Sequence, residues 1–327
     1  KSFKFGGIIM TFVASKQGIK NSGMEWQKHY QPIDIKKLKI LHLFQWRIND
    51  IIPELKTIKD QGFDAIQISP IQGTKDSGME WWKLYQPINL KIGNEQIGSR
   101  KDLINLIQEA RKYNIRIIVD IVLRHVAGDE SYPLKPHRNV DPELLPYLAE
   151  PINGVNVDSD RWQCTRRCTG MPMLNYDDPE LQKLYKRFLD ELVFIGVDGF
   201  RLDQLKHYAL PQEGSNIMGL FMQYKMYGEC INCSNRLLNE YIKYMKVLTE
   251  GRPWDISRLV AKFETHDDYL GEGPGLGLTK RMTDQMRLTE WDILVNHLPG
   301  CDCLYYTRPF ETLWKSEEMR KINMGEF

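Results

Sequence analysis

From residue 40 onward, short apolar segments alternate with amphipathic ones, and this alternation constrains the fold more than any other feature. Residues 115–122 are almost wholly apolar and mostly β-branched, which is typical of a strand buried on both faces. Residues 51–58 repeat apolar side chains at helical spacing. The other strand candidates are residues 40–46, 63–69, 197–202, 222–228, 244–249, 259–263 and 303–306. Strands and helices that alternate in this number predict an α/β fold, a parallel (β/α)8 TIM barrel.

The expected helices cover most, but not all, of the connections between these strands. Ser99 can cap a helix that buries Leu103, Leu106 and Ala110. The other expected helices are residues 181–194, 236–245 and 280–297. About ten residues join the sixth and seventh strands, whereas a full crossover takes a dozen or more. The chain also stops soon after the eighth strand, so we expect a barrel that is incomplete at helices 6 and 8.

One long segment interrupts the alternation after the third strand. Residues 126–177 are rich in Pro, Asn, Asp and Gly, and they are too many for an ordinary loop. We therefore expect a small inserted domain at 126–177, with the barrel formed by residues 40–125 and 178–327.

The chain also contains a short internal repeat near its start. Residues 17–33 closely repeat residues 72–88, but two copies do not form a solenoid. We expect residues 1–39 to be an N-terminal extension that partly duplicates residues 56–94. The apolar run at 5–14 is shorter than the ~20 residues that cross a bilayer, and no persuasive signal-peptide cleavage site follows it. No membrane partner is expected, and the compartment, secreted or cytoplasmic, stays open.

Charge and cysteine content narrow the remaining classes. The chain has 44 Lys and Arg against 43 Asp and Glu, a balance that argues against nucleic-acid binding; we expect a monomer. Six cysteines allow fifteen pairings, among which the sequence does not choose. Zinc is an alternative, and reduced thiols are the simplest interpretation. The cysteines form three close pairs: Cys164 and Cys168, Cys230 and Cys233, and Cys301 and Cys303.

Polar and aromatic residues gather where the expected strands end. Such barrels carry their active sites at the C-terminal ends of the strands, so Asp203, Glu229 and Asp267 are expected to converge. Two carboxyl groups, one ionised and one protonated, are the equipment for glycoside hydrolysis. A neighbouring cation such as Arg201 favours the ionised form. Other residues at the same ends are Trp81, Trp82, Tyr85, Gln86, Asp120, Arg124, His125, Lys206, His207 and His266.

These strand-end motifs, in this order, resemble those of the α-amylase family of glycoside hydrolases over residues 40–309. The run Trp81-Trp82-Lys83-Leu84-Tyr85-Gln86-Pro87 is similar to that of animal and related bacterial α-amylases. The resemblance implies retaining endo-hydrolysis of α-1,4 bonds in starch or glycogen, with an α-glucan as the partner. An inactive or decayed carbohydrate-binding member remains an alternative. A transglycosylase or α-1,6-glucosidase is another, because fold and shared carboxylates do not separate these reactions.

The resemblance also implies roles for individual residues. Asp203 would be the nucleophile, Glu229 the general acid and base, and Asp267 a stabiliser of the distorted transition state. Retention predicts carboxyl groups of Asp203 and Glu229 about 5–5.5 Å apart. Arg201 would keep Asp203 charged. The expected substrate contacts are Trp81, Trp82, Tyr85, Gln86, His125, Arg201, Lys206, His207 and His266.

Calcium and chloride are the cofactors that the resemblance implies. Arg124 stands where the family usually has an Asn that binds calcium, and a guanidinium carries only donors. We therefore expect a guanidinium in place of the ion, with Asp158 and Asp160 as partners; a retained metal site would use these carboxylates and His207. For chloride, Arg201 and Arg308 match the basic pair of the family, and Thr265 stands where an Asn is usual.

Overall fold

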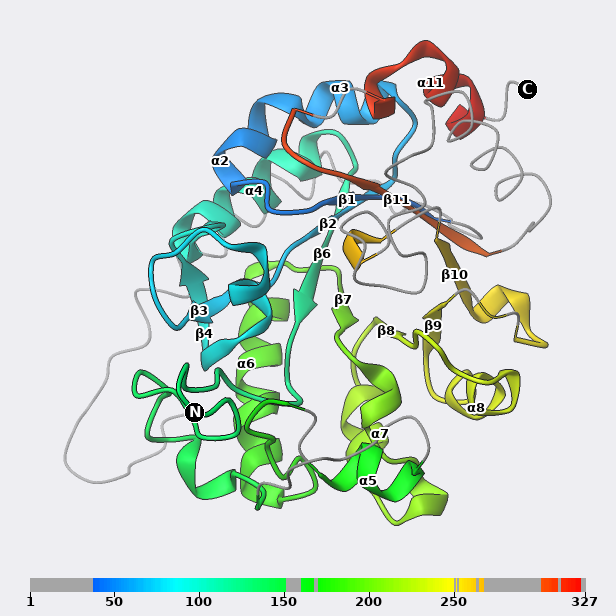
Figure 1. Ribbon diagram of the computed structural model, residues 1–327. Helices are drawn as coiled ribbons and strands as arrows, with labels where there is room; N and C mark the ends of the chain where they lie inside the picture. Colours follow the sequence, from blue (N-terminus) through cyan, green and yellow to red (C-terminus); the bar gives the residue numbers. More distant parts are fainter. Residues whose placement is uncertain are drawn as a thin grey trace, which may run out of the picture.

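Eight parallel strands close into a barrel in the computed structural model, which confirms the predicted (β/α)8 fold (Figure 1). The structure describes residues 38–150, 160–167, 170–249, 251, 253–262, 265–267, 301–310 and 313–324. Around the barrel the order is β1-β11-β10-β9-β8-β7-β6-β2. The strands are β1 (Lys39–Leu43), β2 (Ala65–Ile68), β6 (Arg116–Ile121), β7 (Gly199–Leu202), β8 (Met226–Glu229), β9 (Lys246–Thr249), β10 (Leu259–Lys262) and β11 (Asp302–Thr307).

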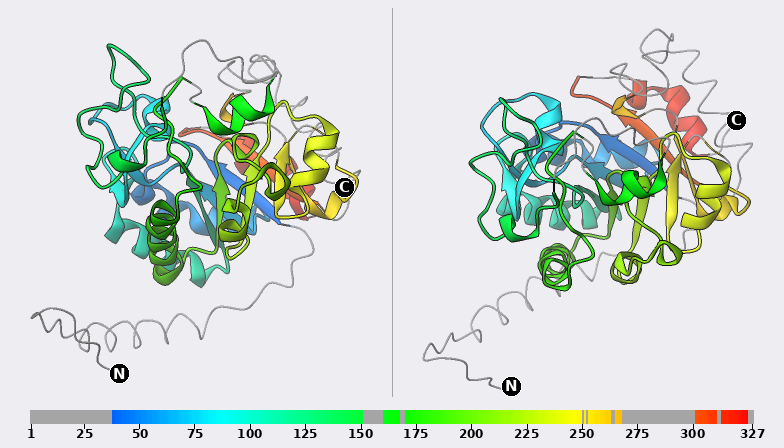
Figure 2. Two further views of the ribbon diagram at one scale, coloured as in Figure 1. Left: turned by 90° about the horizontal axis from the view of Figure 1, so that it is seen from below. Right: turned by 60° about the horizontal axis from the view of Figure 1, so that its bottom comes forward.

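Helices of unequal length cover the outside of this barrel. Among the described residues, the longest are α4 (Arg100–Lys112) and α6 (Pro179–Ile195). Figure 2 shows α6 and α7 nearly end-on, below the strands in its right view. The remaining helices are α2 (Ile48–Ile51), α3 (Leu55–Asp60), α5 (Arg161–Arg166), α7 (Ile217–Phe221), α8 (Asn235–Tyr241) and α11 (Glu317–Met324). Short 3-10 helices are η1 (Ile52–Glu54), η2 (Trp81–Tyr85), η3 (Leu145–Tyr147), η4 (Leu205–His207), η5 (Pro211–Glu213), η6 (Ile256–Arg258) and η8 (Leu313–Lys315).

The two long helices begin and end at residues suited to those places. Ser99 caps α4 and forms a capping box with Asp102, as predicted. The side chain of Asp178 accepts hydrogen bonds from the first N–H groups of α6, and Pro179 follows it. Gly196 ends α6 in the left-handed region, at φ 108°, a conformation that glycine adopts without a steric penalty. These signals fix where the chain turns back towards the next strand.

The core has two layers. The inner layer lies within the barrel and takes residues from seven of the eight strands: Ile40, Ala65, Ile118, Tyr227, Leu248, Val260 and Leu304. A larger layer lies between the strands and the helices and includes Leu41, Ile66, Leu103, Ile117, Leu106 and Phe188. Because the strands are buried on both faces, their sequences are continuous apolar runs, and these runs allowed the strands to be predicted from the sequence.

The second half of the barrel is irregular, as the short connections predicted. Within the described residues, only η6 lies between β9 and β10, and α11, which follows β11, has 8 residues. One strand prediction was wrong at its start: Met222 is the C-cap of α7 rather than part of β8. The apolar run there belongs to two elements, and periodicity alone does not divide a short run.

The segment after β6 packs against the barrel and against a small sheet. That sheet joins β3 (Gln72–Thr74), β4 (Pro87–Asn94) and β5 (Gly98–Ser99). Figure 1 shows the segment beside β3 and β4, below the barrel. Its buried apolar residues Val126, Val140 and Leu174 belong to the same core layer as the barrel helices. The segment is therefore held by the barrel core.

Two predicted features lie outside the described residues, the extension at 1–39 except its last two residues, and the helix at 280–297. Among the described helices, none combines the length and the apolar character that a membrane span requires.

Candidate active site

The barrel places the three predicted carboxylates at one end. Asp203 comes directly after β7, Glu229 ends β8, and Asp267 follows β10. After Asp203 the chain turns sharply, because Gln204 adopts the left-handed conformation at φ 53°, a strained state for a residue with a side chain. Gly228 lets β8 approach η4 closely: a Cβ at this position would lie 2.5 Å from Leu205 Cδ2. Both features bring Glu229 towards Asp203.

Arg201 joins the carboxylates at the floor of the site. Its Nη1 donates to Asp203 Oδ1 at 2.8 Å and to Asp120 Oδ1 at 2.9 Å. Its Nη2 donates to Glu229 Oε1, and Gln204 N lies 3.4 Å from Glu229 Oε2. Bidentate and charge-assisted bonds of this kind fix geometry strongly. The guanidinium therefore orients both predicted catalytic carboxylates at once.

Aromatic and imidazole rings form one wall of the site. The ring of His266 stacks between Tyr85 and Phe44, with centroids 5.0 Å and 4.6 Å away. The hydroxyl of Tyr85 donates to Asp120 Oδ2 at 2.8 Å. His125 Nε2 is 2.8 Å from the main-chain oxygen of Tyr85, and its Nδ1 has no partner in the described part of the chain. Tyr85, predicted to stack on a sugar ring, thus has one face against His266.

These residues line a single pocket of about 330 Å³. Both the floor and the aromatic wall contribute to it, together with residues from the segment after β6. The lining consists of Trp81, Trp82, Tyr85, Gln86, His125, Gly170, Met171, Asp203, Gln204, Glu229, His266 and Asp267. Nine of these twelve were predicted from the sequence as site residues, so the structure brings most of the predicted set together.

Burial and neighbouring carboxylates raise the pKa values of two acidic groups at the floor of the site. Burial raises the pKa of Asp203 well above its usual value, Arg201 opposes this shift, and Glu229 and Asp120 add to it. Burial also raises the pKa of Asp120, to about 6, against the pull of Arg201. One guanidinium faces three carboxylates. Like charges packed this closely oppose one another's ionisation, and the Arg201 guanidinium offsets part of this effect.

Besides Arg201, which bonds to the carboxylates without lining the pocket, three residues predicted to bind substrate or chloride do not line it. The ring of His207 is buried, and its Nδ1 lies 3.3 Å from Cys164 Sγ. Burial, with Arg124 and Lys206 nearby, lowers the pKa of His207 to about 3. The main-chain oxygen of Lys206 accepts a hydrogen bond from Arg161. Arg308 follows β11 and is half-buried. For these residues, the position after a strand in the sequence did not determine where the side chain points.

Gln204, Gly170 and Met171 are functional candidates that the sequence argument missed, and Asp120 was placed at a strand end without a predicted role. Asp120 is fully buried and contacts both Arg201 and Tyr85. A charged residue inside an otherwise apolar strand was the available signal, because charges are almost never fully buried unless they are paired. Gly170 and Met171 reach the pocket from the segment after β6, and no local pattern marks them.

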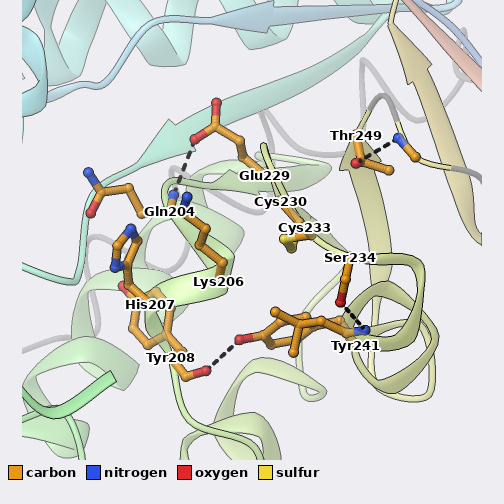
Figure 3. The surroundings of a disulfide bond; sticks show 12 residues. Gln204, Lys206, His207, Tyr208, Glu229, Cys230, Cys233, Ser234, Tyr241 and Thr249 are labelled. Atoms are coloured by element: carbon orange, nitrogen blue, oxygen red, sulfur yellow. Dashed lines mark hydrogen bonds between the residues drawn. A yellow bond between two sulfur atoms is a disulfide. The ribbon is translucent and has the colours of Figure 1, made fainter. Parts of the chain in front are cut away.

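A disulfide directly follows Glu229. Cys230 and Cys233 are bonded, with a Cα–Cα distance of 5.7 Å. Figure 3 shows this bond beside Glu229, Lys206 and Ser234. The interpretation of all cysteines as reduced thiols is therefore wrong for this pair, while Cys164 is a free thiol. The Sγ atoms of Cys301 and Cys303 lie 4.0 Å apart. Zinc finds no support in the described residues, where no three potential ligands cluster.

The predicted metal position is occupied by a side chain that cannot bind a cation. Arg124 is buried, and its guanidinium donates to main-chain oxygens. The carboxylate of Asp160 accepts from Gln163 N and Nε2, where it caps α5, so the expected pairing of Asp160 with Arg124 is wrong. Asp158 lies outside the described residues. Donor-only nitrogen atoms do not coordinate calcium, and this position therefore does not fit the ion.

A parallel (β/α)8 barrel with a carboxylate pocket at the C-terminal ends of its strands is the architecture of many glycoside hydrolases. Residues 47–250 match the family model described as alpha amylase, catalytic domain. An α-amylase of Clostridium acetobutylicum is 30% identical over 338 residues, which cover 89% of this chain and 44% of that protein. The chain therefore belongs to the α-amylase family.

Other relatives agree with this assignment. An α-amylase-related protein of Drosophila serrata is 32% identical over 185 residues, 52% of this chain and 37% of that protein. The chain thus spans less than half the length of these curated relatives.

Solved structures share the fold. The Geobacillus thermoleovorans α-amylase complexed with acarbose has a TM-score of 0.68 and 16% identity, and covers 88% of this chain and 76% of its own. A maltohexaose complex of Eisenia fetida α-amylase I has a TM-score of 0.65 and 19% identity, and covers 86% and 68%.

Proposed function

We propose that this chain is the catalytic part of a retaining hydrolase that cleaves α-1,4 bonds within starch- or glycogen-type α-glucans. In this proposal residues 40–125 and 178–327 form the catalytic barrel, and residues 126–177 are the inserted domain. The main support for this proposal is that the buried guanidinium of Arg201 donates hydrogen bonds to both Asp203 and Glu229 beside the pocket. Relatives in the same family were crystallised with maltohexaose and acarbose, which supports an α-glucan as substrate.

The chemistry proceeds in two balanced steps. An oxygen of Asp203 attacks the anomeric carbon while the glycosidic C–O bond breaks, and Glu229 gives its proton to the departing oxygen. Water then attacks the same carbon, its proton passes to Glu229, and the bond to Asp203 breaks. Asp267, at the pocket rim, bonds to sugar hydroxyls and stabilises the distorted ring. Arg201, whose Nη1 donates to Asp203 Oδ1 at 2.8 Å, favours the ionised carboxylate that attacks in the first step.

The aromatic wall suits the apolar faces of glucose rings. Trp82 is more exposed than Trp81, and Lys75 lies 4.8 Å above its ring. Tyr85 and His125 line the same pocket. A ring held by these groups would present its anomeric carbon to the carboxylates on the floor, and rings on either side would extend over Trp81 and Trp82. This open arrangement favours cleavage within a polymer.

Chloride fits one part of the site. The Nε of Arg201 is buried and has no partner in the described part of the chain, so an anion such as chloride would satisfy it. Arg201 would hold the ion, and Arg308 and Thr265 are the other residues expected near it. A bound chloride would help to hold the Arg201 guanidinium in place beside Asp203 and Glu229. Complete removal of halide is expected to lower kcat; unchanged activity would exclude this role.

Starch hydrolysis by the purified chain tests the proposal. We expect the chain to release reducing ends from soluble starch, and NMR to show that the products retain the anomeric configuration. We also expect kcat to fall by about 10⁴-fold or more in Asp203→Asn and in Glu229→Gln. The matched control is Asp198→Asn, because Asp198 precedes the opposite end of β7 and pairs with Arg111 and Arg116. That variant should lose stability and keep kcat.

Three results would contradict the proposal. Absence of reducing ends from the folded, unmutated chain favours the inactive carbohydrate-binding alternative. Products with new α-1,4 bonds favour a transglycosylase, and selective cleavage of branch points favours an α-1,6-glucosidase.

A further inference from the structure

A second buried arginine, Arg124, lies at the junction between the barrel and the segment after β6. Its side chain is 1% exposed. Nε donates to the main-chain oxygen of His207 at 2.9 Å. Nη2 faces the main-chain oxygens of Thr165 and Arg167 at 3.2 Å and of Cys164 at 3.4 Å. One guanidinium thus gathers four carbonyl oxygens.

These oxygens belong to two separate parts of the chain. His207 ends η4, which follows β7 in the barrel. The other three lie at the end of α5, in the inserted segment. The last carbonyls of a helix have no partners within it, and they carry negative partial charge that favours a cation. Arg124 therefore ties the end of α5 to the barrel.

The main chain and a neighbouring ring reinforce the same junction. The main-chain oxygen of Arg124 accepts from Leu174 N at 3.0 Å. Its guanidinium carbon lies 5.2 Å from the centroid of Tyr176, in the geometry of a cation–π contact. The hydroxyl of Tyr176 donates to Thr165 O at 2.6 Å. Two of these contacts join the inserted segment to Arg124, and the third ties Tyr176 to the end of α5 within that segment.

The oxygens around Arg124 have the chemistry of a calcium ligand set. Calcium in proteins takes main-chain carbonyl oxygens among its six to eight ligands, and the family resemblance implies calcium at this position. A guanidinium bonded to the same oxygens leaves them facing a fixed positive charge, which would repel a metal ion. No carboxylate of the described residues bonds to Arg124, so the junction needs no acidic ligand either.

We propose that the Arg124 guanidinium replaces the metal ion of the family as a built-in cation, which fastens the inserted segment to the barrel without calcium. Gly170 and Met171 of that segment line the pocket, and His125 is the neighbour of Arg124. The clamp therefore holds one wall of the pocket. This inference concerns folding and stands whether or not the pocket hydrolyses glucans.

Calcium dependence of the unmutated chain is the first test. We expect the same Tm in excess calcium, in excess magnesium and after removal of divalent ions with EDTA. A ligand that binds the folded state at many times its Kd must raise the Tm. A rise of several degrees in calcium, or a fall of several degrees in EDTA, would therefore overturn the proposal.

Arg124→Asn tests the clamp itself, and Arg111→Asn is its matched control. Arg111 is also buried and donates to Gly196 O and Ile115 O, away from α5. We expect Arg124→Asn to lower the Tm by about 5–10 °C and to speed proteolytic cleavage within residues 126–177 below the Tm by at least tenfold. Arg111→Asn should lower the Tm without this selective cleavage. Equal cleavage of Arg124→Asn and the unmutated chain would refute the clamp.

Arg124→Lys covers the case in which the Asn variant does not fold. Lysine keeps the charge, but its compact ammonium cannot span four oxygens as a planar guanidinium does. We expect faster cleavage of the same segment and a smaller fall in Tm than for Asn. Cleavage at the unmutated rate would show that any cation serves and would overturn the specific role of the guanidinium.

Discussion

Two fully buried arginines organise this barrel in opposite ways. Arg201 faces the carboxylates of Asp120, Asp203 and Glu229. Arg124 faces only neutral main-chain oxygens in the described residues. Burial alone would lower the pKa of Arg201, but its carboxylate neighbours raise it well above the usual value. At Arg124 burial prevails, and the pKa is lowered.

This difference shows that a buried arginine can orient reactive carboxylates or join two segments of the chain, depending on which groups surround it. An arginine surrounded by more carboxylates than it can neutralise holds these reactive groups in place, and burial together with their excess negative charge raises the pKa of some of them. An arginine among main-chain carbonyl oxygens has no titratable partner, so its role is to hold two segments of the chain together. Substitution of Arg201 should therefore reduce activity more than stability, whereas substitution of Arg124 should reduce stability more than activity.

The same substitution at both positions tests this contrast most strongly. We expect Arg201→Lys to lower kcat/KM on starch by about 10²–10³-fold, because one ammonium cannot bond to three carboxylates at once. Arg124→Lys should keep kcat/KM within a few-fold and lower the Tm. Steady-state kinetics and calorimetry on both variants make the comparison. Equal losses of activity at the two positions would contradict it.

The two regions should also respond to pH with opposite signs. Asp120, beside Arg201, has a pKa raised to about 6. The unfolded chain ionises near pH 4 while the fold keeps the proton, so stability is lost as pH rises from about 4 to 6. His207, beside Arg124, has a pKa lowered to about 3. Its contribution is complete above pH 6.5 and is lost as pH falls towards 3, because only the unfolded chain takes up the proton.

The pH dependence that each group contributes is measured by comparing the free energy of unfolding of a variant with that of the unmutated chain. Across its own pH window, each substitution should change the free energy of unfolding relative to the unmutated chain, by up to about 3 kcal/mol for Asp120→Asn and up to about 5 kcal/mol for His207→Gln. Denaturant unfolding at several pH values measures both. If the two differences vary with pH in the same direction, the electrostatic contrast is wrong.

The disulfide after Glu229 should give the smallest effect. Cys230 and Cys233 close a loop with a sequence separation of 3, and such a short loop limits the stabilisation to about 2 kcal/mol. The double variant Cys230→Ala/Cys233→Ala should lower the Tm by a few degrees and lower kcat modestly, because Glu229 precedes the loop. Cys164→Ala, beside His207 at the other arginine, should leave kcat unchanged. A larger fall in kcat for Cys164→Ala would reverse this assignment.

Much of the fold was predictable because its signals are local. Apolar runs located the strands, the capping residue Ser99 placed α4, and a short connection anticipated the vestigial helix between β9 and β10. The start of β8 was not predictable, since Met222 continues an apolar run that the structure divides between α7 and β8. Only packing decides how such a run is shared.

The site was predictable in its residue types and less so in its contacts. Carboxylates after β7, β8 and β10 were expected to meet, and they line one pocket. The role of Asp120 was not predicted, because it depends on Arg201 from a neighbouring strand. His207 was misplaced because its ring turns towards Cys164, some forty residues earlier in the chain.

The sequence by itself determined the barrel, its irregular second half and the convergence of Asp203, Glu229 and Asp267, because strand-end position in a parallel barrel dictates proximity. The tertiary structure alone decided which charges share partners. It placed Arg201 among three carboxylates and Arg124 among four carbonyl oxygens. Those partners come from distant segments, and the energy of a buried charge depends on what surrounds it in space.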